Sequence, residues 1–92
     1  MDRRIDLIAK ALAKKRLTIN PLDDGSGVVL DVEGEKLLTM NATGMTIIQA
    51  IEDGAHSVGA IARVVTSVFE VDDAAADQDV HAFVENVSGQ LK

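Results

Sequence analysis

The sequence predicts an α+β fold, in which one helix precedes a three-stranded antiparallel sheet and a three-helix unit follows it. Two patterns indicate this fold. Between residues 17 and 40, short runs rich in Val, Leu and Thr alternate between apolar and polar residues, which is typical of strands. From residue 41 almost to the end, apolar residues recur at helical spacing. The change falls within Met40–Gly44, where we expect the sheet to meet the helices.

The first helix is expected over residues 3–14, because Asp2 can accept hydrogen bonds from its free amide groups. Its apolar residues recur at i, i+3, i+4 and i+7, and they are Ile5, Ile8, Ala9 and Leu12. The stripe is narrow, so it could pack on its own domain or on a second copy. The second arrangement would make a homodimer through residues 3–14.

The strands follow in order. Residues 17–20 alternate until Pro21, which lacks an amide donor and suits an edge strand. The cluster Asp23–Gly27 is typical of a turn. A second strand is predicted over Val28–Val32, with the side chains of Val28, Leu30 and Val32 on one face.

A tight turn at Glu33–Gly34 leads to the third strand, Lys36–Met40, and we expect Gly34 to supply a positive φ angle. The result is an antiparallel meander with two open edges. An uncovered edge is a template for another extended chain.

Three helices complete the chain. Asn41 is expected to cap the first, and Gly54 to end it. Ser57 is expected to cap the second, and Asp72 or Asp73 the third. A small sheet on a three-helix unit is the outline of a winged-helix-like domain. We predict an N-terminal helical extension over residues 1–15 and this domain over residues 16–92.

Composition excludes several functions. The chain has 92 residues, no Cys, Trp or Tyr, and a formal net charge of −6. Disulfides and thiolate chemistry are therefore absent, and base stacking and duplex DNA binding are disfavoured. No apolar run is long enough to span a membrane, so we expect a cytoplasmic protein without membrane contact.

The charges are unevenly distributed. Six of the nine Lys and Arg residues lie within residues 1–16, whereas the remainder of the chain is strongly acidic. This basic segment is either a solvated helix face or a docking surface for an acidic partner.

Catalytic patterns are missing. His56 and His81 have no further ligand type at a recognisable spacing, so no metal site is predicted. No serine lies in a nucleophile motif, and the glycines match no phosphate-binding or dinucleotide-binding motif. The sequence predicts neither an enzyme nor a cofactor.

A family resemblance rests on a string of short motifs. They are Met40-Asn41-Ala42-Thr43-Gly44, Ile47-Ile48, Asp53-Gly54, Ser57-Val58 with Ile61, Phe69-Glu70-Val71-Asp72, and Asp79-Val80 with Phe83. In this order and spacing, over roughly residues 26–91, the chain resembles the PqqD-like family. That family includes pyrroloquinoline quinone synthesis protein D and related leader-peptide recognition elements. Three departures from the family pattern together favour a divergent member: the extra helix over residues 3–14, the ending Gly89-Gln90-Leu91 in place of Gly-Leu, and the lack of an acidic pair after Val58.

The resemblance implies a winged-helix-like, non-catalytic adaptor. Such an adaptor binds the leader of a ribosomally made precursor peptide and presents it to a modifying enzyme, often a radical S-adenosylmethionine enzyme. It also implies that the leader adds as a strand to the third strand and lies against the last helix. The implied peptide-binding residues are Lys36, Leu37, Leu38, Thr39, Met40, Ala76, Asp79, Val80, Phe83, Val84 and Val87.

Two alternatives stay open. For Val80, Phe83 and Val84, core packing competes with a place at the edge of a groove. For the whole chain, the alternative function is a winged-helix DNA-binding transcriptional regulator, in which residues 57–69 would contact DNA. That segment offers only Arg63 as a cation, which is too little for specific binding.

Overall fold

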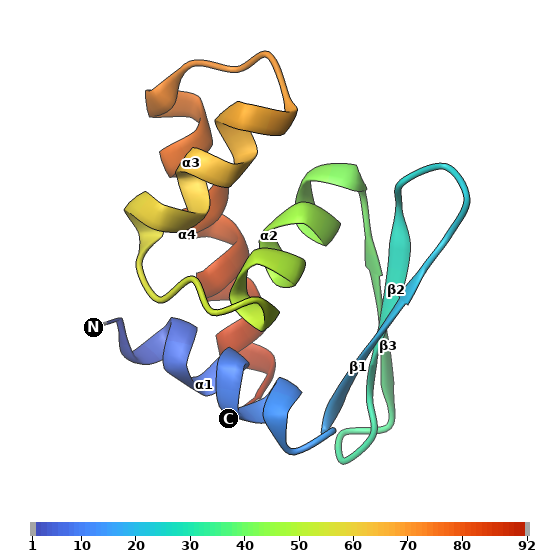
Figure 1. The fold of residues 1–92 in the computed structure, drawn as a ribbon. Helices are drawn as coiled ribbons and strands as arrows, with labels where there is room; N and C mark the ends of the chain where they lie inside the picture. Colours follow the sequence, from blue (N-terminus) through green and yellow to red (C-terminus); the bar gives the residue numbers. More distant parts are fainter. Residues whose placement is uncertain (1, 92) are drawn as a thin grey trace.

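The computed structural model describes residues 2–91 and places the helices on one side of a three-stranded sheet (Figure 1). The elements are α1 (Arg3–Ala13), β1 (Leu17–Pro21), β2 (Gly27–Asp31), β3 (Lys36–Met40), α2 (Ala42–Glu52), α3 (Val58–Val68) and α4 (Asp73–Gln90). The predicted α+β order is therefore confirmed.

Each helix begins at an expected capping residue. The side-chain oxygens of Asp2, Asn41, Ser57 and Asp72 accept hydrogen bonds from backbone N–H groups of the first turns of α1 to α4. These bonds satisfy donors that have no partner within the helix. The cap at Asn41 also connects β3 directly to α2, so it fixes the angle at which the sheet meets the helices.

The sheet is antiparallel in the order β1-β2-β3, with β2 in the centre. Leu38 of β3 lies opposite Val29 of β2, and Met40 lies opposite Gly27. Within residues 2–91 no further strand pairs with the outer edge of β1 or of β3. Both edges are therefore free to accept backbone hydrogen bonds from an added strand.

The face of β2 that packs on the helices is not the one with the predicted apolar set. Val28, Leu30 and Val32 do share a face, but it is the outer one, and Val32 is 52% exposed. Buried instead are Val29 and Asp31, which alternate with them. Because the covered face carries a buried aspartate whereas the outer face carries Val28 and Leu30, apolar alternation alone indicates the wrong face.

In the β2–β3 turn, the glycine does not have the positive φ angle that the sequence predicted. The positive φ angle, 53°, belongs to Glu35 and not to Gly34. The Gly34 N–H donates to Asp31 Oδ1 at 3.0 Å, and a Cβ atom at residue 34 would lie 2.6 Å from Asp31 Oδ2. A glycine is needed here because the backbone approaches a carboxylate, not because of its conformational freedom.

Asp31 is the one buried carboxylate among residues 2–91, at 1% exposure, and Arg16 is its partner. Arg16 Nε donates to Asp31 Oδ1 at 3.1 Å, and Arg16 Nη1 donates to the Leu91 carbonyl at 3.1 Å. One guanidinium thus joins the end of β2 to the end of α4. The hydrogen bond from Arg16, and then that from Gly34, lower the pKa of Asp31.

The apolar stripe of α1 packs within its own domain. Ile5 and Ile8 are fully buried in the same core as α2 and α4, and Leu12 is 6% exposed. This is the first of the two arrangements that the sequence left open. A homodimer through residues 3–14 cannot use this stripe, because the stripe is already covered, and it would need the solvent face of the helix.

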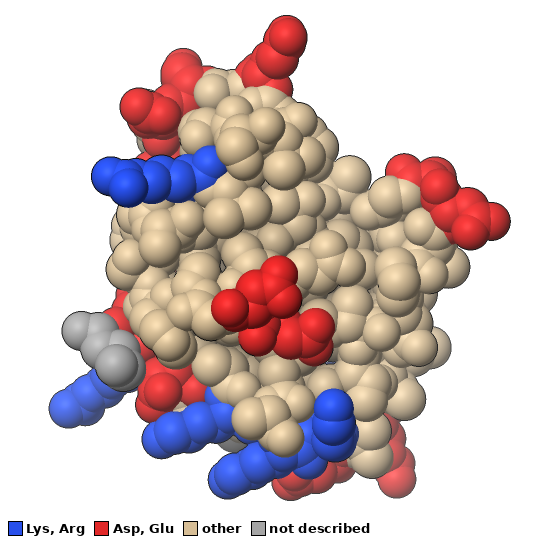
Figure 2. Space-filling view, in the orientation of Figure 1, with Lys and Arg blue, Asp and Glu red and all other residues tan. Residues whose placement is uncertain are grey.

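Charge is segregated on the surface. On the face shown in Figure 2, most Lys and Arg side chains gather at the end of the molecule where α1 lies in Figure 1, and the sheet side shows few cations. No helix within residues 2–91 has the length and hydropathy needed to cross a membrane.

Replacing Asp31 by Asn should destabilise the fold by roughly 1–3 kcal/mol at neutral pH, because Arg16 loses its charged partner. The pKa of Asp31 is lowered in the folded state, so its stabilisation is complete above the ordinary value of about 3.9 and is lost as the pH falls through the lowered value. Urea unfolding at several pH values measures this. The gap between wild type and Asp31→Asn should be constant down to about pH 4 and shrink below it.

The exposed turn residue Asp23 gives the control, since Asp23→Asn should leave the unfolding free energy almost unchanged. An equal effect of the two substitutions would contradict the assigned role of the buried ion pair.

Candidate functional site

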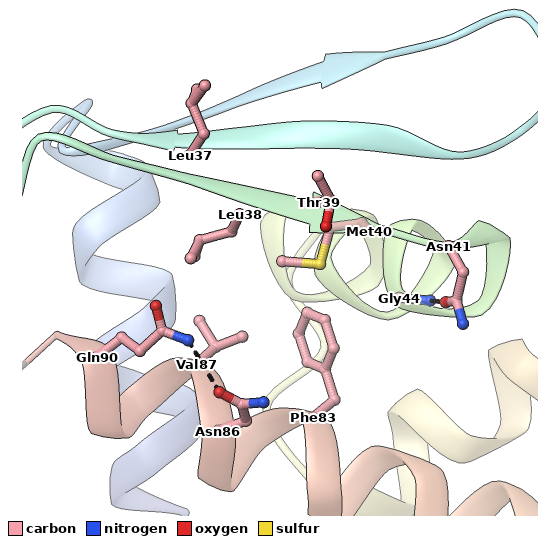
Figure 3. A pocket seen from close by; sticks show the side chains of 10 residues that line it. All are labelled: Leu37, Leu38, Thr39, Met40, Asn41, Gly44, Phe83, Asn86, Val87 and Gln90. Carbon is pink, nitrogen blue, oxygen red and sulfur yellow. Dashed lines mark hydrogen bonds between the residues drawn. The ribbon is translucent and has the colours of Figure 1, made fainter.

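A groove of about 400 Å³ lies between β3 and α4 (Figure 3). Its lining residues come from β3, the first turn of α2 and the C-terminal half of α4. They are Leu37, Leu38, Thr39, Met40, Asn41, Gly44, Phe83, Asn86, Val87 and Gln90. The groove therefore runs along β3, one of the two strands whose outer edge is unpaired.

The side chains on the two walls face each other. Leu38 and Met40 point from β3 toward α4, and Phe83 and Val87 point back toward the strand (Figure 3). Met40 and Val87 are also part of the hydrophobic core. These walls are consequently held by core packing and do not depend on a ligand for their position.

The first turn of α2 closes one part of the groove. Asn41 Oδ1 accepts from the Gly44 N–H at 2.8 Å, which places Gly44 beside both walls. A Cβ atom at residue 44 would lie 3.3 Å from Met40 Sδ and 3.3 Å from Phe83 Cε2. Glycine here keeps α2 close to the groove without moving either wall.

The polar side chains that line the groove are three amides and the hydroxyl of Thr39. Gln90 Nε2 donates to Asn86 Oδ1 at 2.9 Å on α4, and Asn41 lies across from them at the end of β3. None of the lining residues is titratable. The groove can therefore offer hydrogen bonds and apolar contact, but its own side chains cannot transfer a proton at neutral pH.

Seven of the predicted residues lie at or beside the groove. Leu37, Leu38, Thr39, Met40, Phe83 and Val87 line it, although the side chain of Leu37 projects from the other face of the sheet (Figure 3). Asp79 lines a smaller adjoining depression of about 220 Å³ that shares Asn41, Gly44 and Phe83 with the groove.

The other predicted residues lie elsewhere. Ala76, Val80 and Val84 are completely buried in the core, so they support α4 from behind and do not line the groove. Lys36 is exposed at the start of β3, outside the lining. Val80 and Val84 thus pack in the core, whereas Phe83 is half-buried and lines the groove.

Sequence reasoning missed Asn41, Gly44, Asn86 and Gln90 as lining residues. A signal for two of them was present, since Asn86 and Gln90 lie three and seven positions after Phe83 and so share its helix face. Asn41 and Gly44 were recognised for the β3–α2 junction, but only the folded chain shows that this junction borders the groove.

The opposite edge of the sheet has a different character. The depression beside β1 has a volume of about 360 Å³ and is lined partly by the charged residues Lys15 and Glu52. Pro21 ends that strand and removes one backbone donor. A strand added there would meet charges and an incomplete set of partners, which makes the β3 edge the better candidate.

Residues 2–91 contain no cluster of three or more metal-ligating side chains. His81 lies 3.6 Å from Asp77, and both side chains are about half exposed on the surface of α4. This pair is an ordinary i, i+4 contact and lies apart from the groove.

Comparison with protein families supports a relationship over most of the chain. The family model described as coenzyme PQQ synthesis protein D (PqqD) matches residues 26–90. That span contains β3, α2 and α4, and so every residue that lines the groove. No match was found among curated proteins or among solved structures.

Replacing Gly44 by Ala should move the groove walls without unfolding the protein. Ala gains up to about 1 kcal/mol over Gly in a helix, but its Cβ must push Met40 and Phe83 aside by a few tenths of an ångström. We expect chemical shifts of the Met40 methyl group and the Phe83 ring to change, with a stability gain clearly below 1 kcal/mol.

Gly59 is a matched control, because it also lies in the first turn of a helix but has no atom within 4 Å of its added Cβ. Gly59→Ala should give the larger gain in unfolding free energy and leave the Met40 and Phe83 signals in place. Identical behaviour of the two variants would show that the close approach at Gly44 does not shape the groove.

Proposed function

The chain belongs to the family of coenzyme PQQ synthesis protein D, and on this premise we propose that it is a peptide-binding adaptor. The adaptor binds the leader segment of a ribosomally made precursor peptide in the groove between β3 and α4. The leader adds to the sheet as a fourth strand. The adaptor then presents the peptide to a modifying enzyme, such as a radical S-adenosylmethionine enzyme.

The observation that carries the proposal is an open strand edge beside an uncharged groove. Strand addition obtains affinity from backbone hydrogen bonds and specificity from pockets for alternate side chains. The edge of β3 supplies the first, and the space between Leu38, Met40 and Phe83 supplies the second. Neither requires a catalytic group, which agrees with a family of non-catalytic accessory proteins in PQQ synthesis.

The sequence of β3 lacks most of the features that protect an open strand edge from pairing. Proteins usually protect open edges with charged residues, proline or bulges. The strand β3 reads Lys-Leu-Leu-Thr-Met and carries a single charge at its start, whereas β1 ends in Asn20 and Pro21. An edge left unguarded beside a preformed groove supports a role in which that edge is used.

The modifying enzyme needs a surface that the peptide leaves free. The basic side chains of α1 and of the turn after it, including Arg3, Lys14 and Lys15, do not line the groove. An acidic patch on the enzyme could contact them while the leader occupies β3, because the two surfaces belong to different elements.

Amide exchange followed by NMR tests the strand addition. The isotope-labelled protein is titrated with synthetic leader segments of precursor peptides encoded near its gene. Alternate amides within Lys36–Met40 should become protected, because outward N–H groups gain backbone partners, and signals of Phe83 and Val87 should shift with them. Shifts confined to α3, with β3 unchanged, would refute strand addition.

Proline substitutions sharpen this test. Successive residues of an edge strand direct their N–H groups alternately inward and outward, so of Leu37→Pro and Leu38→Pro one removes an outward donor. That variant should fold and lose peptide binding, whereas proline at the outward residue of the pair Thr18 and Ile19 on β1 should leave binding intact. Loss of binding from the β1 variant instead would place the peptide on the other edge.

The alternative function, duplex DNA binding, finds little support in α3. Arg63 is the one cation of this helix, and the protein carries a formal net charge of −6. Specific DNA binding requires several phosphate and base contacts. We expect no retention of duplex DNA in a gel-shift titration at moderate salt. Tight, sequence-dependent retention would favour the regulator.

A further inference from the structure

We propose that the bound segment is recognised on both faces of the extended sheet, and that Leu37 is a specificity-determining residue on the face away from α4. This inference rests on the proposed strand addition and defines its substrate class further. The ligand is an extended segment with apolar residues at adjacent positions, one facing the groove and the next facing the outer surface.

The observation behind it is the position of Leu37. Its side chain is 69% exposed, more than any other large hydrophobic residue that the structure describes. It projects from the sheet on the side opposite Leu38 and Met40 (Figure 3). A leucine on an open edge would normally be guarded, and the one charge on this strand is Lys36 at its start.

Leu37 also ends a row that crosses the sheet. It lies opposite Leu30 of β2, which lies opposite Thr18 of β1. The neighbouring row runs from Asn20 through Val28 to Thr39. The outer face at the β3 edge is therefore apolar at Leu37 and polar two residues later at Thr39.

An added strand would continue both rows. Directly opposite residues on one face of an antiparallel pair have Cβ atoms roughly 4.5–5.5 Å apart, and apolar pairs at this distance stabilise the sheet. The ligand residue beside Leu37 should consequently be apolar, whereas the residue beside Thr39 can be polar or β-branched. The alternate residues of the ligand would face the groove and contact Leu38, Met40 and Phe83.

A peptide is a better occupant of this edge than a second copy of the chain. Two copies would each bring a net charge of −6, and they would repel each other. A second copy would also bring its own α4 toward the α4 that borders this edge. A single extended segment would occupy only the width of one strand, about 4.8 Å, beside the edge of β3.

Two synthetic peptides of eleven residues test the inference. Both carry Val at the groove-facing positions and Lys at the ends, and they differ only in the central outer-facing residue, which is Thr in one and Val in the other. Wild-type protein should bind the Val peptide about 1.5- to 5-fold more tightly by NMR titration. Leu37→Thr should abolish this preference while the affinity for the Thr peptide stays the same.

Val32 gives the control, because it is exposed on the same face but lies in the turn and not on the open edge. Val32→Thr should keep the wild-type preference. A preference of equal size in wild type and Leu37→Thr would overturn the role of Leu37 and leave strand addition standing, provided that β3 amides are protected. Binding of neither peptide at millimolar concentration would count against the proposed function itself.

Sedimentation tests whether a second copy of the chain, and not a peptide, occupies the edge of β3. Wild type and Leu37→Thr should both sediment as the same species without peptide. A wild-type dimer that Leu37→Thr dissociates would assign the exposed leucine to a contact between copies and overturn the proposal.

Discussion

The bridge from Arg16 to Asp31 and Leu91 is the interaction on which the arrangement of sheet and helices depends. Asp31 lies at the end of β2, and Leu91 follows the last turn of α4, so one side chain joins the central strand to the helix that borders the groove. Burying a carboxylate costs free energy unless it is paired and hydrogen-bonded. Asp31 meets both conditions through Arg16 and Gly34, which ties the buried charge to one arrangement of these elements.

The opposite end of the groove is set by a close approach of backbone. The Asn41 cap turns the chain from β3 into α2, and Gly44 then lies beside Met40 and Phe83. On the core side of the same helix, Val80 and Val84 are completely buried and anchor α4. The groove is thus a space that the packed elements leave open, and a ligand can use it without reorganising them, which lowers the entropic cost of binding.

The sequence predicted element order well because each helix carries its own start signal, an acceptor at Asp2, Asn41, Ser57 or Asp72 followed by a helical apolar pattern. It failed where the answer depended on distant residues. Nothing near Asp31 in the chain shows that Arg16 pairs with it, and so an aspartate on the covered face of β2 could not be expected. The buried set of α4 was recognisable, but its division between core and groove was not, because Val84 and Phe83 are equally apolar and only the position of β3 separates them.

The exposed Leu37 says more about the function of β3 than the buried residues of the sheet do. Core positions such as Val29 are apolar in any stable fold, so their identity says little about function. The side chain of Leu37 is largely exposed, so for its size it contributes little to the stability of residues 2–91. It also lies on a strand edge that is open to association. A domain with a net charge of −6 can keep such an edge without pairing with its own copies, because like-charged copies repel. The occupant that we propose for this edge is a short extended segment, whose alternate side chains would contact the groove on one face of the sheet and Leu37 on the other.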